Sequence, residues 1–142
     1  MRTIDKLLAQ YSESHLNPTN EVIHFICVPV IVFTLLGLLW SMHWALAVLV
    51  TIASLVYYVK LSKPFAVGMA LMAGAMLLVL AALPDQVILP LSIAIFVLAW
   101  VGQFIGHQIE GKKPSFLEDV RFLLIGPLFV LSFLYRRLNL AY

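Results

Sequence analysis

Three polar residues at the end of an apolar run have the spacing of a helical metal site. Gln103 and His107 are four residues apart, and Glu110 follows His107 by three. On a helix, residues three or four apart share one face. Neutral imidazole is a good ligand for iron, zinc and copper, and a nearby carboxylate can bind the same metal or orient the histidine. We therefore interpret this face as one half of a metal site.

Two histidines near the N-terminus are candidates for the other half. His15 and His24 each follow a polar residue by four positions, Tyr11 and Asn20 respectively. Three histidines can occupy one side of a metal and leave other positions open for reactants. We predict His15, His24 and His107 as the metal ligands, with Tyr11 and Asn20 as the residues that orient them.

Glu110 and Gln103 are the predicted catalytic residues. Three roles remain open for Glu110: a metal ligand, a general base, or a partner that orients His107. Gln103 is expected to orient His107 from one turn away. In the alternative interpretation, the histidines are ordinary structural residues at helix ends. A single metal is expected, because the chain has too few histidines for the dinuclear site of membrane desaturases and too few carboxylates for a di-iron bundle.

Two lysines and a fourth histidine lie at the edges of apolar segments. Lys112 and Lys113 are most simply partners of lipid headgroups, and the more specific hypothesis is that one of them pairs with a fatty-acid carboxylate. His43 lies between Trp40 and Trp44, which is typical of the aromatic belt at a membrane surface. We therefore leave His43 out of the metal site.

The composition indicates that a membrane must position these residues. The chain has 142 residues, enough for one domain, of which 63% are hydrophobic, and its mean hydropathy is +1.01. Soluble proteins contain roughly 45–50% apolar residues. The net charge of +2 is too small to indicate a nucleic-acid partner, and one cysteine excludes an internal disulfide and a multi-thiolate zinc site. We predict an integral membrane protein.

The apolar pattern predicts an all-α bundle of four transmembrane helices. Each apolar run is near the length that a bilayer requires, and the short links force antiparallel neighbours. Before the first span, polar and apolar residues alternate with the period of an amphipathic interfacial helix, and Asn17-Pro18 is typical of a helix start. The predicted elements are this interfacial helix at 2–16 and spans at about 24–40, 44–60, 65–83 and 87–107.

The last apolar segment, within 120–138, is predicted to be re-entrant or interfacial. It has only 14 apolar residues, Phe122–Tyr135, and Gly126-Pro127 interrupts it. Four spans with both termini in the cytoplasm place every cluster of Lys and Arg on the same side, as the positive-inside rule requires. The predicted ligands near the N-terminus and after the fourth span then lie at the same membrane face.

Four blocks of the sequence carry a resemblance to a known family. They are His15, the stretch Asn17–Pro29 (N-x-x-N, then H-x-x-C-x-P), the stretch Gln103–Pro114 (Q-F-I-G-H-x-x-E-G-K-K-P) and Ile125–Phe129 (I-G-P-L-F). Together they resemble the fungal 2-hydroxy-palmitate dioxygenase family, and Q-F-I-G-H is the most specific block. The differences, namely Cys27 and the spacing between His107 and Glu110, suggest a bacterial branch.

The resemblance implies an Fe(2+)-dependent enzyme that uses O2 to shorten a 2-hydroxy fatty acid by one carbon, the reaction of α-oxidation. The family's histidines fall on His15, His24 and His107. The implied partners are the fatty acid, O2 and membrane lipids, with a homo-oligomer allowed. The implied location is the bacterial inner membrane, or the endoplasmic reticulum in a eukaryote.

Three alternatives remain open from the residues themselves. In the first, the protein is a haem-binding electron carrier with His24 and His107 as the axial ligands. A metal-dependent lipid hydrolase and a lipid-binding bundle without turnover are the other two. Bound haem would identify the electron carrier, and bound zinc would favour the hydrolase. A bundle without turnover should keep its function when His15, His24 or His107 is replaced by alanine.

Overall fold

The computed structural model describes residues 2–12, 17–111 and 124–142, and these residues form helices connected by short links. No strand occurs within the described ranges, so the all-α prediction is confirmed there. The helices are α1 (Thr3–Ser12), α2 (Pro18–Met42), α3 (Trp44–Leu61), α4 (Lys63–Ala82), α5 (Asp85–Glu110) and α7 (Gly126–Arg137).

Four of these helices are long and apolar enough to cross a membrane, as the sequence predicts. They are α2, α3, α4 and α5, of which the shortest has 18 residues. At 1.5 Å per residue, 18 residues extend about 27 Å, close to the hydrocarbon thickness of a bilayer. With 12 residues, α7 is too short to span it, and Gly126-Pro127 begins this helix. The placements of α1 and α7 relative to the bilayer stay predictions.

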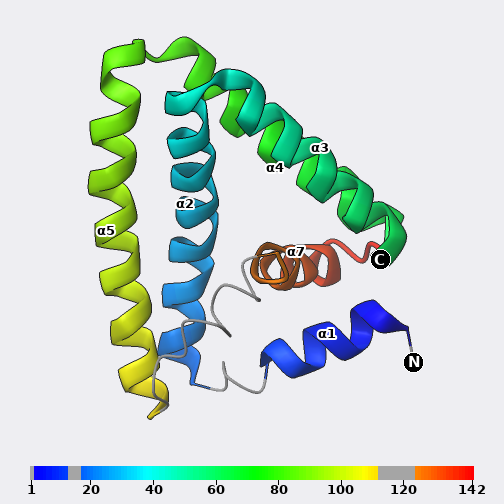
Figure 1. The fold of residues 1–142 in the computed structure, drawn as a ribbon. Coiled ribbons are helices and arrows are strands. Elements are labelled where there is room, and N and C mark those ends of the chain that lie inside the picture. Colours follow the sequence, from blue (N-terminus) through cyan, green and yellow to red (C-terminus); the bar gives the residue numbers. More distant parts are fainter. Residues whose placement is uncertain (1, 13–16, 112–123) are drawn as a thin grey trace.

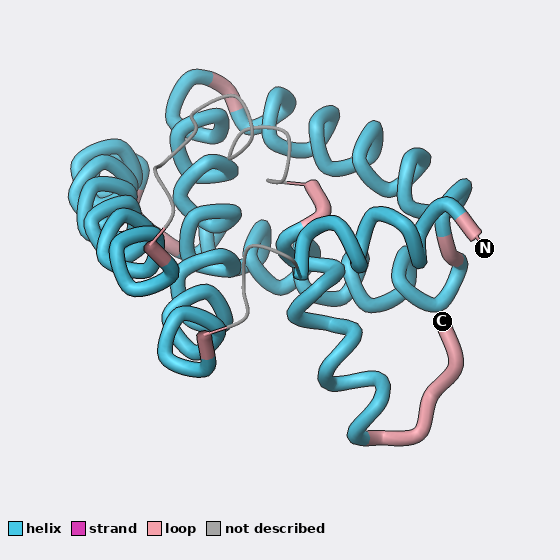
Figure 2. The backbone as a smooth tube through the Cα atoms, turned by 90° about the horizontal axis from the view of Figure 1, so that it is seen from below, coloured by secondary structure: helices cyan, strands magenta, loops and turns pink. Residues whose placement is uncertain are grey.

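The four long helices form two pairs that diverge (Figure 1). Helix α2 packs against α5, and α3 packs against α4. The pairs meet at one end and separate toward the other, where α7 lies between them with α1 beside it. Figure 2 shows the same arrangement from below, with both chain ends on one side of the molecule.

Local caps explain where the long helices begin. Pro18 occupies the first turn of α2, and the side chain of Asn17 accepts a hydrogen bond from the backbone N–H of Thr19 at 2.9 Å. This is the start that the sequence predicts, because proline lacks the N–H that a first turn leaves unpaired. His43 caps α3 and Ser62 caps α4 in the same way. Links of one or two residues then leave antiparallel packing as the only arrangement.

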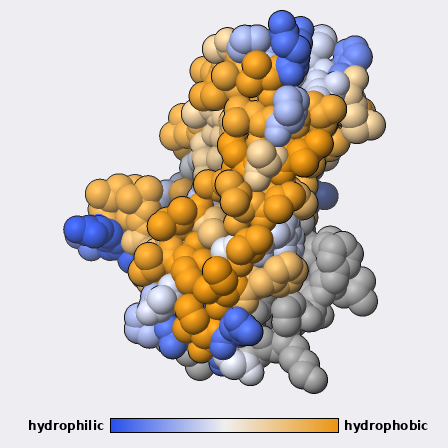
Figure 3. Space-filling view, turned by 90° about the vertical axis from the view of Figure 1, so that its left-hand side faces the viewer, coloured by the Kyte–Doolittle hydropathy of each residue, from blue (hydrophilic) through white to orange (hydrophobic). Residues whose placement is uncertain are grey.

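Two hydrophobic clusters hold the described helices together. One lies at the open end and joins α1, α3, α4 and α7, and the other joins α2, α3, α4 and α5 where the pairs meet. Outside these clusters, large apolar side chains face outward along all four long helices. Figure 3 shows them as a broad apolar surface with hydrophilic residues at its ends. This is the surface expected for contact with lipid.

Candidate metal centre

The register between α2 and α5 is set by two close approaches. A Cβ placed on Gly102 would lie 2.7 Å from Sγ of Cys27, and one placed on Gly37 would lie 2.1 Å from Oγ of Ser92. Ten residues separate Cys27 from Gly37, and ten separate Ser92 from Gly102. In this antiparallel pair, each step of one residue forward along α2 therefore corresponds to one residue backward along α5. Glycine permits this because a larger side chain would push the backbones apart.

Glu110 supplies a third contact in the same register. Its carboxylate accepts a hydrogen bond from the backbone N–H of Asn17, the N-cap of α2. A negative charge is favoured at a helix N-terminus, where backbone N–H groups have no partner within the helix. The last residue of α5 thus holds the first turn of α2.

This register sets the levels of His24 and His107. His24 precedes Cys27 by three residues, so its position faces Ile105, three residues after Gly102. His107 is two residues farther along α5, an offset of about 3 Å along the axis. The backbones of two predicted ligands therefore lie on facing helices at nearly the same depth. Their side chains, like those of residues 13–16 and 112–123, lie outside the described part of the structure.

Buried amide side chains lie one turn from each of these positions. Asn20, on α2, is 1% exposed, and Gln103, on α5, is 6% exposed. Within the described residues, Oε1 of Gln103 is buried and has no hydrogen-bond donor, and Nε1 of Trp100 is buried and has no acceptor. A buried polar group without a partner costs about 1–3 kcal/mol. The region therefore offers a buried acceptor and a buried donor to which a metal-binding side chain or a substrate would hydrogen-bond.

Tyr11 brings α1 to the same end of the bundle. Its side chain is 4% exposed, and its ring lies 4.8 Å from the ring of Phe129. A Cβ placed on Gly126 would lie 3.2 Å from the Tyr11 hydroxyl and 3.0 Å from Cγ1 of Val28. Tyr11, the start of α7 and α2 therefore meet one turn beyond His24. No role in the metal site was predicted for Gly126, although the I-G-P-L-F block of the sequence includes it.

The remaining predicted residues are either remote or outside the described ranges. His43 is exposed at the far end of α2, 19 residues from His24, or about 28 Å away. Its Nδ1 accepts a hydrogen bond from the N–H of Ala45 at 3.0 Å. His15, Lys112 and Lys113 lie outside the described residues. Among described side chains, no three His, Cys, Asp or Glu form a metal group, and that set does not include the three predicted ligands.

Comparisons with known proteins identify a family and a relative that this chain resembles. The model of the family described as "2-hydroxy-palmitic acid dioxygenase Mpo1-like" matches residues 1–138. The chain is 29% identical over 140 residues to 2-hydroxy-palmitic acid dioxygenase MPO1 of Saccharomyces cerevisiae. That alignment covers 91% of this chain and 78% of the yeast protein. No solved structure matches.

Proposed function

The chain belongs to the Mpo1-like family, and we propose that it is a membrane enzyme that shortens 2-hydroxy fatty acids by one carbon, with Fe(2+) as its metal and O2 as its oxidant. The family match and the name of the yeast relative, a 2-hydroxy-palmitic acid dioxygenase, support the substrate class. The structural observation that carries the proposal is the register of α2 on α5. It sets His24 and His107 at nearly the same depth beside the buried side chains of Asn20 and Gln103.

The reaction balances without an added reductant. A 2-hydroxy acid, R–CHOH–COOH, and O2 give R–COOH, CO2 and water. The C1–C2 bond breaks, C2 is oxidised from an alcohol to a carboxylic acid, and the electrons reduce O2. The chain therefore needs a site for the acid, a site for O2 and a metal, and it needs no nicotinamide or flavin domain.

His15, His24 and His107 would hold the metal in this proposal. Imidazole and carboxylate ligands with open positions are typical of non-haem Fe(2+) sites, and such iron, when bound, supplies activation of O2. Zinc is less suitable because it has no accessible redox chemistry. Oε1 of Gln103 is a buried acceptor one turn from His107 and would take an imidazole N–H, which fixes the ring orientation.

Glu110 acts in this proposal as a positioning residue. One of its oxygens is bound to the N–H of Asn17 and so joins the helices that carry His24 and His107. In the sequence, Lys112 and Lys113 come two and three residues after the end of α5, and we assign them to the substrate carboxylate. A fatty acid would then have its charged end at this face of the membrane and its chain between the helices.

Anaerobic reconstitution with Fe(2+) followed by addition of O2 tests the activity. Mass spectrometry of a series of 2-hydroxy fatty acids should show acids that are one carbon shorter. Failure to form a shortened acid at any chain length would contradict the proposed reaction. In the same preparation, a Soret band would point to a haem carrier, and zinc that remains bound after purification would point to a hydrolase.

A further inference from the structure

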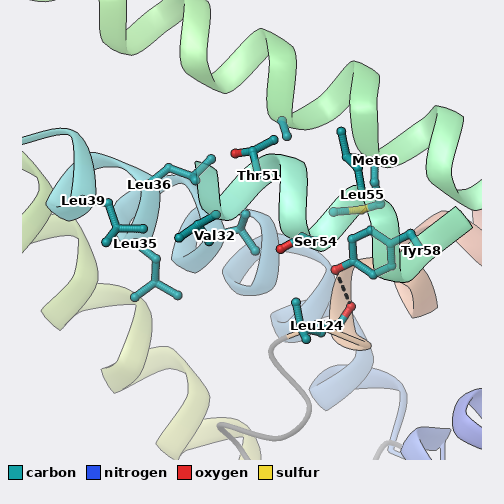
Figure 4. Close-up of a pocket in the computed structure, with 12 residues that line it drawn as sticks. Val32, Leu35, Leu36, Leu39, Thr51, Ser54, Leu55, Tyr58, Met69 and Leu124 are labelled. Atoms are coloured by element: carbon teal, nitrogen blue, oxygen red, sulfur yellow. Dashed lines mark hydrogen bonds between the residues drawn. The ribbon is translucent and has the colours of Figure 1, made fainter. Parts of the chain in front are cut away.

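An apolar cavity lies between α2, α3 and α4 (Figure 4). Its volume is about 120 Å³. Helix α2 contributes Val32 and Leu36, α3 contributes Leu55, and α4 contributes Met69 and Ala73. The cavity is thus built where the two helix pairs begin to separate.

Two of the three hydroxyl-bearing side chains that line the cavity, Thr51 and Tyr58, turn their hydroxyl groups to the backbone, and the third is Ser54. The hydroxyl of Thr51 donates to the carbonyl of Ala47 at 2.8 Å, and that of Tyr58 donates to the carbonyl of Leu124 at 2.7 Å. These hydrogen bonds satisfy both donors within the protein. Apart from Ser54, the rest of the lining is apolar, so the cavity favours a hydrocarbon over a strongly polar ligand, which would lose most of its hydration there.

Distance along α2 relates this cavity to the candidate metal centre. Val32 and Leu39, which both line the cavity, lie 8 and 15 residues after His24, or about 12 and 22 Å along the helix. One acyl chain in one leaflet extends over about 15 Å, half of the hydrocarbon thickness. A fatty acid with its carboxylate near the level of His24 would therefore end inside the cavity.

The start of α7 connects the two regions. Leu124 lines the cavity, and Gly126, two residues later, lies against Tyr11 and Val28 near the candidate metal centre.

The volume of the cavity also fits the end of an acyl chain. An engineered apolar cavity of about 150 Å³ admits benzene, a six-carbon ligand, so this one has room for the last few carbons of an acyl chain.

We propose that the cavity receives the methyl end of the 2-hydroxy fatty acid and sets the chain length that the enzyme accepts. This inference rests on the proposed function, because it takes the substrate from it. The proposed occupant is the substrate chain rather than a chain of a bilayer phospholipid.

Substitution of Ala73 by leucine tests the proposal, because the larger side chain fills part of the cavity. We expect Ala73→Leu to lower product formation from the longest substrates by about 10-fold or more, since one methylene in an apolar pocket changes discrimination by roughly 10-fold or more. Shorter substrates should be processed as in the wild type. Ala70→Leu is the matched control, because Ala70 is exposed on the same helix. An unchanged chain-length profile for Ala73→Leu would overturn the inference while leaving the proposed function intact.

A variant that enlarges the cavity guards against misfolding as an explanation. Leu39→Ala should extend the accepted range to longer chains, a gain that a misfolded protein cannot show. A range that stays the same or becomes shorter would count against the cavity as the chain-length determinant.

A binding measurement tests whether the acyl chain occupies the cavity independently of whether the protein forms product. A 2-hydroxy fatty acid with a diazirine at its methyl end is crosslinked to the protein in lipid nanodiscs, and the labelled peptides are mapped by mass spectrometry. Label on Leu36 or Met69 that an unlabelled 2-hydroxy fatty acid displaces would support the cavity even if no product forms, in which case only the proposed function fails. Label elsewhere, or label that bilayer phospholipid displaces equally, would overturn the inference.

Discussion

The carboxylate of Glu110 accepts a hydrogen bond from the backbone N–H of Asn17 at the start of α2, and His107 lies three residues earlier on α5. Negative charge is unfavourable at the carboxyl end of its own helix and favourable at the amino end of another. The contact with α2 therefore offsets the unfavourable position on α5. At the scale of residues, this geometry supports positioning over direct catalysis.

Two substitutions at this residue distinguish the roles. Glu110→Gln keeps an oxygen that can accept from Asn17, so we expect it to retain most of the affinity for iron. Glu110→Ala removes the acceptor and should weaken iron binding by about 10–100-fold, as is typical when an outer partner of a metal ligand is lost. Iron titration of both variants is the measurement. If glutamine is as damaging as alanine, Glu110 is a ligand or a base instead.

Replacement of a predicted histidine ligand should remove iron from the protein, whereas replacement of a histidine elsewhere should not. His24→Ala and His107→Ala should each lower the bound iron, measured by elemental analysis after reconstitution, to a small fraction of the wild-type value. His43→Asn serves as the control, because asparagine also caps helices and His43 lies at the far end of α2. Equal loss of iron in all three variants would exclude the proposed ligand set.

At the scale of elements, the pairing of α2 with α5 depends on small residues at defined positions. Gly37 and Gly102 allow the close approaches to Ser92 and Cys27 that set the register. Gly74 on α4, by contrast, has open space where a Cβ would be. Glycine therefore has a packing role at the first two positions, and Gly74 has none in the described structure.

Alanine substitution at these glycines tests the difference. For Gly37→Ala, the Ser92 hydroxyl must rotate away or the helices must separate, so we expect a loss of about 1–3 kcal/mol in the free energy of unfolding. Gly74→Ala should cause no loss, because alanine is the better helix former. Denaturant titration in detergent measures both. Similar losses for the two variants would show that the close contact is not what stabilises the pair.

At the scale of the whole molecule, the four long helices of the described ranges bring the chain back to the end of the bundle where it begins. Figures 1 and 2 show both ends of the chain on that side, and α1 packs against α7. The first hydrophobic cluster, which includes Ile4, Phe65 and Leu128, joins these short helices to α3 and α4. The short helices α1 and α7 thus fill the space between the two helix pairs at the end where the pairs separate.

Labelling of single cysteines tests this topology. In a Cys27→Ser background, Thr3→Cys and Leu140→Cys should react with an impermeant maleimide from one side of sealed vesicles, and Ser41→Cys from the other. All three positions are exposed. With both termini cytoplasmic, inverted inner-membrane vesicles should label the first two. Reaction of Thr3→Cys and Leu140→Cys from opposite sides would mean that the chain crosses the membrane an odd number of times.

The sequence by itself determined the features that depend on local interactions. Each of the four long helices is apolar over its own length, and the capping by Asn17 and Pro18 involves only neighbouring residues. The spacing of Gln103, His107 and Glu110 likewise indicated a shared helical face without reference to any other segment. These are short-range properties, so the pattern of residues was sufficient to predict them.

Only the tertiary structure decided which faces of these helices meet. Helix α2 is apolar almost all round, so its periodicity does not indicate a partner or a register. The contact of Glu110 with a backbone N–H and the cavity beside Ala73 both follow from how separate helices pack. Such packing depends on close approaches like that of Gly37 to Ser92, between residues far apart in the chain. The chemistry of the candidate metal centre therefore stays a prediction from the sequence, and the packing of α2 on α5 adds that the backbones of His24 and His107 lie at nearly the same depth.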